Sequence, residues 1–242
     1  MESNRCILVG GEKGGTGKST IATNLAIMFK LAGFDTHLVD CDTQQTSLKL
    51  ASRRAAQGMT PPLICTHLAG NQLQVPLIDL AEKYDIVVID CGGQDSVELR
   101  SAMITPCVDL IIIPVQAGYF DLETLVNMNA LVQTSKIYNA RLVAKCLINR
   151  APTHANITVA SEARDFIQHE LDYLGVLDTV ICDRVSYSYA VAKGEAVVEY
   201  EIRMRRDGKA TKEMVGLYEE ITSCSFPLNK VQAPKNLEVG HG

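Results

Sequence analysis

The sequence lacks any long apolar segment. A membrane-spanning helix needs about 20 consecutive apolar residues, and the best run here, Leu110–Ile113, stops at Pro114. The polar N-terminus leads straight into the short apolar stretch Ile7–Val9 and does not resemble a secretory signal peptide. We therefore expect a cytoplasmic protein with no membrane segment.

The chain also lacks internal repeats and a linker that would divide it. Its 242 residues, 47% of them hydrophobic, suit one large domain better than two small ones. We expect this domain to span residues 1–226. Residues 227–242 show neither helical nor strand periodicity and contain proline, asparagine and glycine, which is typical of a mobile tail.

No two cysteines have the C-x-x-C spacing of a zinc or redox site. Several of them lie inside or just after apolar runs, which favours reduced, buried thiols in a cytosolic protein. A metal or iron–sulfur site is the alternative, and the spacing gives it no support. The eight are Cys6, Cys41, Cys65, Cys91, Cys107, Cys146, Cys182 and Cys224.

Short apolar runs alternate with helix-period segments through most of the chain. The runs are rich in Val, Ile and Leu and show little polar alternation, as strands buried on both faces do. This rhythm predicts an α/β fold with a doubly wound, mostly parallel sheet and helices on both faces. The predicted strands are Cys6–Gly10, Thr36–Asp40, Leu63–Thr66, Ile86–Asp90, Leu110–Pro114, Ala144–Ile148 and Val176–Ile181, and the predicted helices are Lys18–Ala32, Gln72–Lys83, Asp121–Ser135, Asn156–Tyr173 and Lys209–Ile221.

A glycine-rich loop joins the first predicted strand to the first predicted helix. Glycines let several backbone N–H groups point at one anion, and the following helix presents the positive end of its dipole. We predict a phosphate-binding P-loop in which Lys18 reaches the β- and γ-phosphates and Ser19 binds Mg²⁺. A glycine-rich turn that binds nothing is the alternative. The residues expected to contact ATP here are Gly14, Gly15, Thr16, Gly17, Lys18, Ser19 and Thr20.

The loop departs from the ordinary P-loop pattern, G-x-x-x-x-G-K-S/T, because Glu12 stands where the first glycine belongs. The variant K-G-G-x-G-K-S/T matches at every position, and its additional lysine is Lys13. On these residues the chain resembles the deviant Walker A ATPases of the ParA/MinD superfamily, up to about Ile221. The resemblance implies slow, partner-stimulated ATP hydrolysis by a homodimer in which Lys13 contacts ATP across the interface. A lysine there also adds positive charge where negative charge develops in phosphoryl transfer.

Acidic residues end two of the predicted strands, at the edge where parallel sheets bind ligands. Asp40 and Asp42 lie in a segment that resembles the family's D-x-D-P-Q switch motif, with Thr43 in place of proline. By that resemblance Asp42 orients the attacking water, as a catalytic residue beside Lys13 and Lys18, and Asp40 supports the Mg²⁺ shell. Asp90 ends a strand that resembles a Walker B element and implies a further Mg²⁺ contact. Two solvated loop acids are the alternative for Asp40 and Asp42.

The strand that ends at Asn149 and Arg150 resembles the family segment whose asparagine contacts adenine, and we expect both residues to bind ATP. A guanine-reading N-K-x-D motif is missing, since Asn229-Lys230 lacks the acid. ATP is therefore favoured over GTP. A cap at the end of a strand is the alternative for Asn149.

Positive charge gathers near the C-terminus of a chain whose formal net charge is -5. The resembled partition ATPases bind nonspecific DNA through basic residues near this region, and Arg and Lys contacts to phosphate carry no base information. A solvated charged face is the alternative. The candidate DNA contacts are Arg184, Arg203, Arg205, Arg206, Lys209 and Lys212.

Together these features predict a nucleoid-associated, ParA-like ATPase that drives DNA partition or cargo positioning with a ParB-like centromere-binding or adaptor partner. The P-loop begins almost at once, as in the short ParA type, and no terminal amphipathic helix for membrane docking follows Pro227. The alternatives are a MinD-like or conjugation-associated positioning ATPase and a metabolic P-loop enzyme. An electron-transfer protein like the nitrogenase iron protein is less suited, because Cys91 is misplaced for its cluster.

Overall fold

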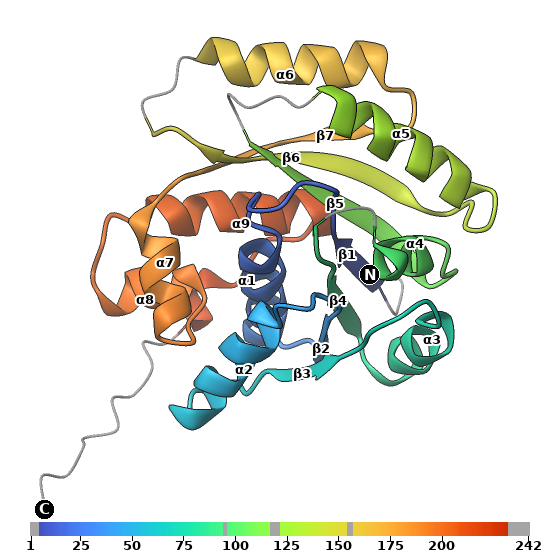
Figure 1. The fold of residues 1–242 in the computed structure, drawn as a ribbon. Coiled ribbons are helices and arrows are strands. Elements are labelled where there is room, and N and C mark those ends of the chain that lie inside the picture. Colours follow the sequence, from blue (N-terminus) through green and yellow to red (C-terminus); the bar gives the residue numbers. More distant parts are fainter. Residues whose placement is uncertain (1–4, 94–95, 117–121, 154–156, 232–242) are drawn as a thin grey trace, which may run out of the picture.

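The computed structural model describes residues 5–93, 96–116, 122–153 and 157–231 (Figure 1). Within them the chain forms a seven-stranded sheet in the order β3-β2-β4-β1-β5-β6-β7, and each strand pairing is parallel. The strands are β1 (Arg5–Val9), β2 (Thr36–Asp40), β3 (Ile64–His67), β4 (Ile86–Asp90), β5 (Val108–Gln116), β6 (Val143–Ala151) and β7 (Gly175–Cys182).

Helices cover both faces of this sheet, as Figure 1 shows. Alternate residues of a strand point to opposite faces, so Ile7 and Val9 join one hydrophobic core while Cys6 and Leu8 join the other. The first core is closed by α1 (Lys18–Leu31), α2 (Thr46–Ala56), α7 (Val185–Ala192), α8 (Val197–Arg203) and α9 (Lys209–Thr222), and the second by α3 (Gln74–Lys83), α4 (Val97–Met103), α5 (Leu122–Lys136) and α6 (Ile157–Glu170).

The predicted doubly wound parallel fold is confirmed, and each predicted strand is present with small changes at its ends. The main difference is β5, which continues through Pro114 to Gln116 and pairs Pro114 with Leu147 of β6. Strand β1 on the other side has its last paired residue, Val9, opposite Ile112. Pro114 therefore lies past the end of β1, where its missing N–H breaks no ladder bond.

Four helices are present that the sequence analysis did not predict: α2, α4, α7 and α8. Helices α4, α7 and α8 have only seven or eight residues, and α2 and α8 bury charged residues where apolar ones would mark the helical period. Arg54 is fully buried in α2, and Glu199 and Glu201 are buried in α8. The predicted starts Asp121 and Asn156 lie outside the described residues, whose helices begin at Leu122 and Ile157.

The packed part of the chain extends past the boundary expected at Pro227. Residues Leu228–Lys230 form a short 3-10 helix, and Val231 is buried in the core formed with α1 and α9. The packed residues therefore reach at least to residue 231, and residues 232–242 lie outside the described part.

The eight cysteines are all free thiols. Cys6, Cys41, Cys91 and Cys146 are buried, as expected, but Cys224 is exposed. Burial raises the pKa of the Cys146 thiol to about 12, so this side chain behaves as a small apolar group of the core.

Candidate nucleotide site

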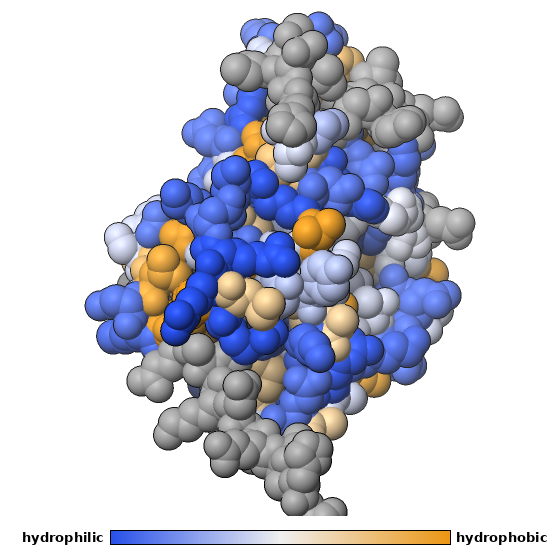
Figure 2. Space-filling view, turned by 90° about the vertical axis from the view of Figure 1, so that its left-hand side faces the viewer, coloured by the Kyte–Doolittle hydropathy of each residue, from blue (hydrophilic) through white to orange (hydrophobic). Residues whose placement is uncertain are grey.

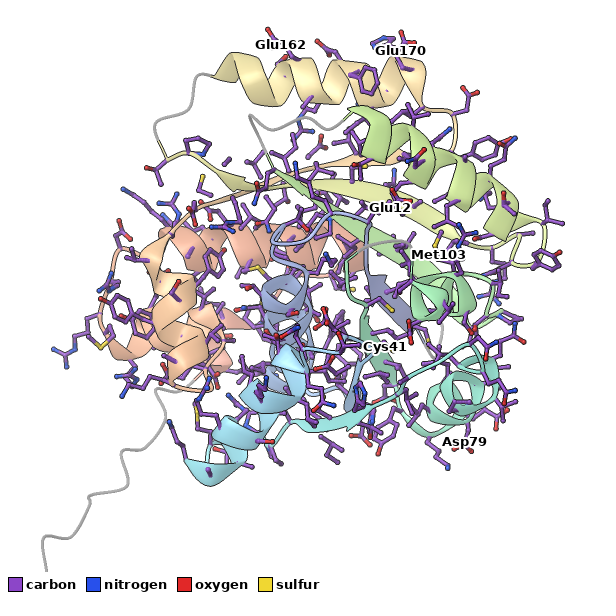
Figure 3. The ribbon with its side chains drawn as sticks, viewed as in Figure 1. Glu12, Cys41, Asp79, Met103, Glu162 and Glu170 are labelled. Carbon is purple, nitrogen blue, oxygen red and sulfur yellow. The ribbon has the colours of Figure 1, made fainter. Side chains whose placement is uncertain are left out.

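The loops that follow β1, β2 and β4 meet at one edge of the sheet. The strand register places Asp90 beside Val9 on one side and beside Asp40 on the other. The P-loop after β1 and the acids at the ends of β2 and β4 therefore converge. In Figure 3 the labelled Glu12 belongs to the P-loop and the labelled Cys41 directly follows Asp40.

The P-loop has the backbone shape of an anion cradle. Helix α1 begins at Lys18, and its N-cap, Gly17, has a φ of 92° and provides no side-chain cap. The first N–H groups of α1 are thus left for a ligand. A Cβ on Gly17 would also lie 2.4 Å from the amide nitrogen of Asn149, so this position requires glycine for both reasons.

Lys18 is buried inside this loop, where its Nζ donates to the carbonyl oxygen of Lys13 at 2.7 Å. Burial lowers the pKa of Lys18, and the negative charges of Asp90 and Asp42 oppose that shift. The ammonium is therefore held between the loop and the two acids. Lys13 itself is half-buried on the loop that precedes α1.

Asp40 shapes the switch segment. One of its carboxylate oxygens accepts from the Asp42 N–H at 3.0 Å, and the other accepts from the Leu48 N–H in the first turn of α2 at 2.8 Å. Both carboxylate oxygens are thus engaged with backbone N–H groups, and Asp40 supports the loop that carries Asp42; its predicted part in the Mg²⁺ shell stays a prediction.

Asp42 and the two glycines after Cys91 lie close to Lys18. A Cβ on Gly92 would lie 3.1 Å from the Asp42 carboxylate, and one on Gly93 would lie 3.2 Å from the Lys18 Nζ. Gly93 also lies against the P-loop backbone at Gly14, so this glycine pair packs between Asp42 and the P-loop.

Asp90 is fully buried, and one of its oxygens, Oδ2, accepts from the hydroxyl of Ser47 at 2.6 Å. Its other oxygen, Oδ1, has no hydrogen-bond partner in the described part of the chain. Burial raises the pKa of Asp90 to about 7, while the hydroxyls of Ser47 and Ser19 oppose the rise.

These residues fit a magnesium ion. An unpartnered buried carboxylate oxygen and the nearby Ser19 hydroxyl are hard oxygen ligands of the kind that Mg²⁺ takes. The described residues contain no group of three or more His, Cys, Asp or Glu side chains that could hold a metal. A magnesium site for nucleotides does not require such a group, because Mg²⁺ is usually bound through one or two carboxylates plus substrate phosphates.

Asn149 and Arg150, predicted to contact ATP, support the P-loop. The Asn149 amide donates to the Thr16 carbonyl oxygen at 2.6 Å, and Arg150 donates to the Gly15 carbonyl oxygen at 2.9 Å. Gln116 at the end of β5 donates to the same Gly15 oxygen at 3.0 Å. The sequence analysis missed Gln116, and its place just after an apolar strand was the signal that could have found it.

A small pocket, partly open to solvent, lies beside the P-loop between the end of β5 and helix α5. Lys13 and Thr16 form one side of it, and its apolar side includes Ile113, Leu125 and Met128. The outer half of the P-loop therefore borders an apolar hollow.

The candidate DNA contacts fall into two groups. Arg203 makes two bonds to Glu195, at 2.6 and 2.9 Å, and Arg184 makes two to Glu213, at 2.8 and 2.6 Å. Lys209 pairs with Asp207 at 3.3 Å. The other three, which are exposed and make no ion pair within the described residues, are Arg205, Arg206 and Lys212. Figure 2 views the molecule from the left-hand side of Figure 1, where α7 and α8 lie, and shows that this face is largely hydrophilic with small hydrophobic islands.

Comparison with known proteins agrees with this geometry. Residues 7–197 match the family model of the CobQ/CobB/MinD/ParA nucleotide binding domain. Maintenance of carboxysome distribution protein A of Halothiobacillus neapolitanus is 28% identical over 212 residues, covering 85% of this chain and 93% of that protein. The sporulation initiation inhibitor protein Soj of Bacillus subtilis is 24% identical over 242 residues, covering 83% and 93%.

Solved structures show the same fold. Apo McdA of Cyanothece superposes with a TM-score of 0.70 at 14% identity, covering 90% of this chain and 99% of that one. The septum site-determining protein MinD of Pyrococcus horikoshii, complexed with Mg-ADP, has a TM-score of 0.68 at 20% identity, with 90% and 96% covered. In the described part of this chain, no helix has the length and apolar character needed to cross a membrane.

Proposed function

This chain belongs to the CobQ/CobB/MinD/ParA nucleotide-binding family, and from that premise we propose that it is a ParA-like ATPase that dimerises around ATP and Mg²⁺ and positions DNA or another cargo. The observation that carries the proposal is the convergence at one edge of the sheet of a P-loop with a buried Lys18, the acid Asp42 after β2, and Asp90 at the end of β4 with an unpartnered oxygen. The relatives include proteins named for carboxysome distribution and for chromosome partitioning.

In this mechanism the loop N–H groups and Lys18 bind the phosphates of ATP. The Ser19 hydroxyl and the Asp90 carboxylate hold the metal. Mg²⁺ held by these two groups would supply positive charge that offsets the charge of the phosphates. Asp42, whose backbone is fixed by Asp40, orients the attacking water, and the Gly92-Gly93 pair lets the backbone approach the γ-phosphate closely.

Lys13 is the residue that we assign to the dimer. It precedes Gly14–Ser19 in the loop, and its carbonyl oxygen accepts from the Lys18 ammonium. We propose that its side chain reaches the nucleotide of a second subunit, where positive charge stabilises the transition state.

The test compares Lys18→Ala with Lys13→Ala. Lys18→Ala should lose nucleotide binding. Lys13→Ala should keep it, stay monomeric by light scattering with ATP and Mg²⁺, and hydrolyse ATP poorly. Asp42→Ala should keep the dimer and lose hydrolysis. Wild-type hydrolysis by the Lys13 variant, or one mass for all proteins with and without ATP, would overturn the dimer mechanism.

The DNA face that we propose consists of Arg205, Arg206 and Lys212. Each phosphate neutralised by such residues contributes about 0.9 to the slope of log K against log salt. Replacing all three with alanine should flatten that slope and leave ATP binding unchanged. Unchanged DNA binding at matched salt and saturating ATP would mean that these residues are only a solvated face, and would favour a metabolic enzyme of the same family.

A further inference from the structure

Two residues in the first turn of α2 form hydrogen bonds to Asp90 and Asp40 of the nucleotide site. The Ser47 hydroxyl donates to Asp90 Oδ2 at 2.6 Å, and the next residue, Leu48, donates its N–H to Asp40 Oδ2 at 2.8 Å. Ser47, Asp40 and Asp90 are all fully buried. A helix that was absent from the sequence prediction thus begins inside the candidate metal site.

The Ser47 bond determines which oxygen of Asp90 is available. A carboxylate can turn about its terminal torsion, whose energy profile is broad. Here Oδ2 is held by Ser47, and Oδ1 is left as a buried atom without a hydrogen-bond partner among the described residues. Because the acid is shut off from solvent, water cannot replace a lost Ser47 hydroxyl without a rearrangement.

We propose that Ser47 is a positioning residue for the metal: it turns Asp90 so that Oδ1 faces the ion, and it fastens the loop that carries Asp42 to the same carboxylate. This inference rests on the proposed ATP and Mg²⁺ binding. Ser47 acts through Asp90 and need not touch the nucleotide. It stands at the second position of α2, and the switch segment after β2 connects it directly to Asp42.

The alternative is that Ser47 only stabilises the start of α2. The two roles differ in one measurable quantity, which is the gain in nucleotide affinity that Mg²⁺ produces. A residue that only stabilises the helix would lower the melting temperature and leave this gain as it is. A residue that orients Asp90 would lower the gain and leave metal-free binding unchanged.

The experiment measures binding of a fluorescent ATP analogue to the full chain in Mg²⁺ and in EDTA, for wild type and Ser47→Ala. We expect equal affinities in EDTA, and a gain from Mg²⁺ that is smaller by about 10-fold, the worth of one hydrogen bond to a charged group. The Mg²⁺ concentration at half-maximal effect should rise in parallel.

Ser52→Ala is the matched control, because it removes a hydroxyl from an exposed position of the same helix. It should keep the full Mg²⁺ gain. Ser47→Cys fills nearly the same space with a weak donor, so it should fold like wild type and still lose most of the gain. An undiminished Mg²⁺ gain in both Ser47 variants would refute the positioning role. A wild type that binds nucleotide equally in Mg²⁺ and EDTA would instead refute the proposed metal-dependent ATPase.

Discussion

Replacing Arg54 with methionine should be among the most destabilising single changes in this fold. Arg54 is fully buried in α2 and makes two parallel bonds to Glu199 of α8, at 2.7 and 2.9 Å. It also donates to the carbonyl oxygens of Pro61 and Gly194, at 2.9 and 3.1 Å. The guanidinium thus joins two helices and two turns through charged hydrogen bonds.

The expected loss of stability is that of a buried carboxylate, Glu199, left without its ion-pair partner. Without Arg54, the buried Glu199 carboxylate keeps the Ala196 N–H as its donor, at 2.9 Å, and has no opposite charge against it. Removal of one partner of a buried ion pair typically costs about 3–5 kcal/mol. Since a domain of this size loses roughly 2–4 °C of melting temperature per kcal/mol, Arg54→Met should melt about 6–20 °C below wild type.

Thermal and urea unfolding followed by circular dichroism measure this loss. Arg53→Met is the matched control, because Arg53 is exposed and makes one bond, to the Val191 carbonyl oxygen at 2.7 Å. It should lose about 1 kcal/mol or less. Adding Glu199→Gln to Arg54→Met should restore part of the stability, because the unpaired charge is then gone. The reasoning would be refuted by a double variant that is no more stable than Arg54→Met, or by an Arg54→Met variant whose stability lies within about 1 kcal/mol of wild type.

Two further changes give sharp expectations. Gly17→Ala should abolish ATP binding in equilibrium titrations, because its Cβ would collide with Asn149 and its φ of 92° disfavours alanine; wild-type affinity would contradict the loop geometry. Arg203→Ala should lower the free energy of unfolding by leaving the buried Glu195 unpaired, whereas Lys212→Ala, at an exposed position of α9, should leave it within about 0.5 kcal/mol of wild type and weaken DNA binding; the reverse pattern would mean that the roles are exchanged.

The strands were predictable because burial on both faces leaves an uninterrupted apolar signature. Thr36–Asp40 and Ile86–Asp90 coincide with the predicted ranges. The P-loop was predictable for another reason, since its glycines and lysines follow from the geometry of phosphate binding. In both cases the local sequence carries the whole signal.

The helices that could not be predicted from the sequence depend on contacts between residues that are distant in the sequence. Arg54 occupies a core position in α2 that an apolar residue would normally fill, and it is tolerated there because Glu199 lies opposite, 145 residues away. Likewise the charge of Arg203 looked available for DNA, but it is paired with Glu195. Ser47 gave no signal at all, because a serine in a short segment is ordinary and only the fold brings it to Asp90.

The basic segment after α8 is mechanically connected to the nucleotide loops. The first turn of α8 is held from one side by α1, where the Asn24 side chain accepts from the Val197 N–H at 2.7 Å, and from the other by the Arg54–Glu199 pair of α2. Helix α1 begins in the P-loop, and α2 begins at the switch segment. Close-packed, hydrogen-bonded contacts pass on a displacement instead of absorbing it. A shift of either loop on ATP binding would therefore move the base of the segment that carries Arg205 and Arg206. In the dimer that we propose, the two basic segments would then be displaced together.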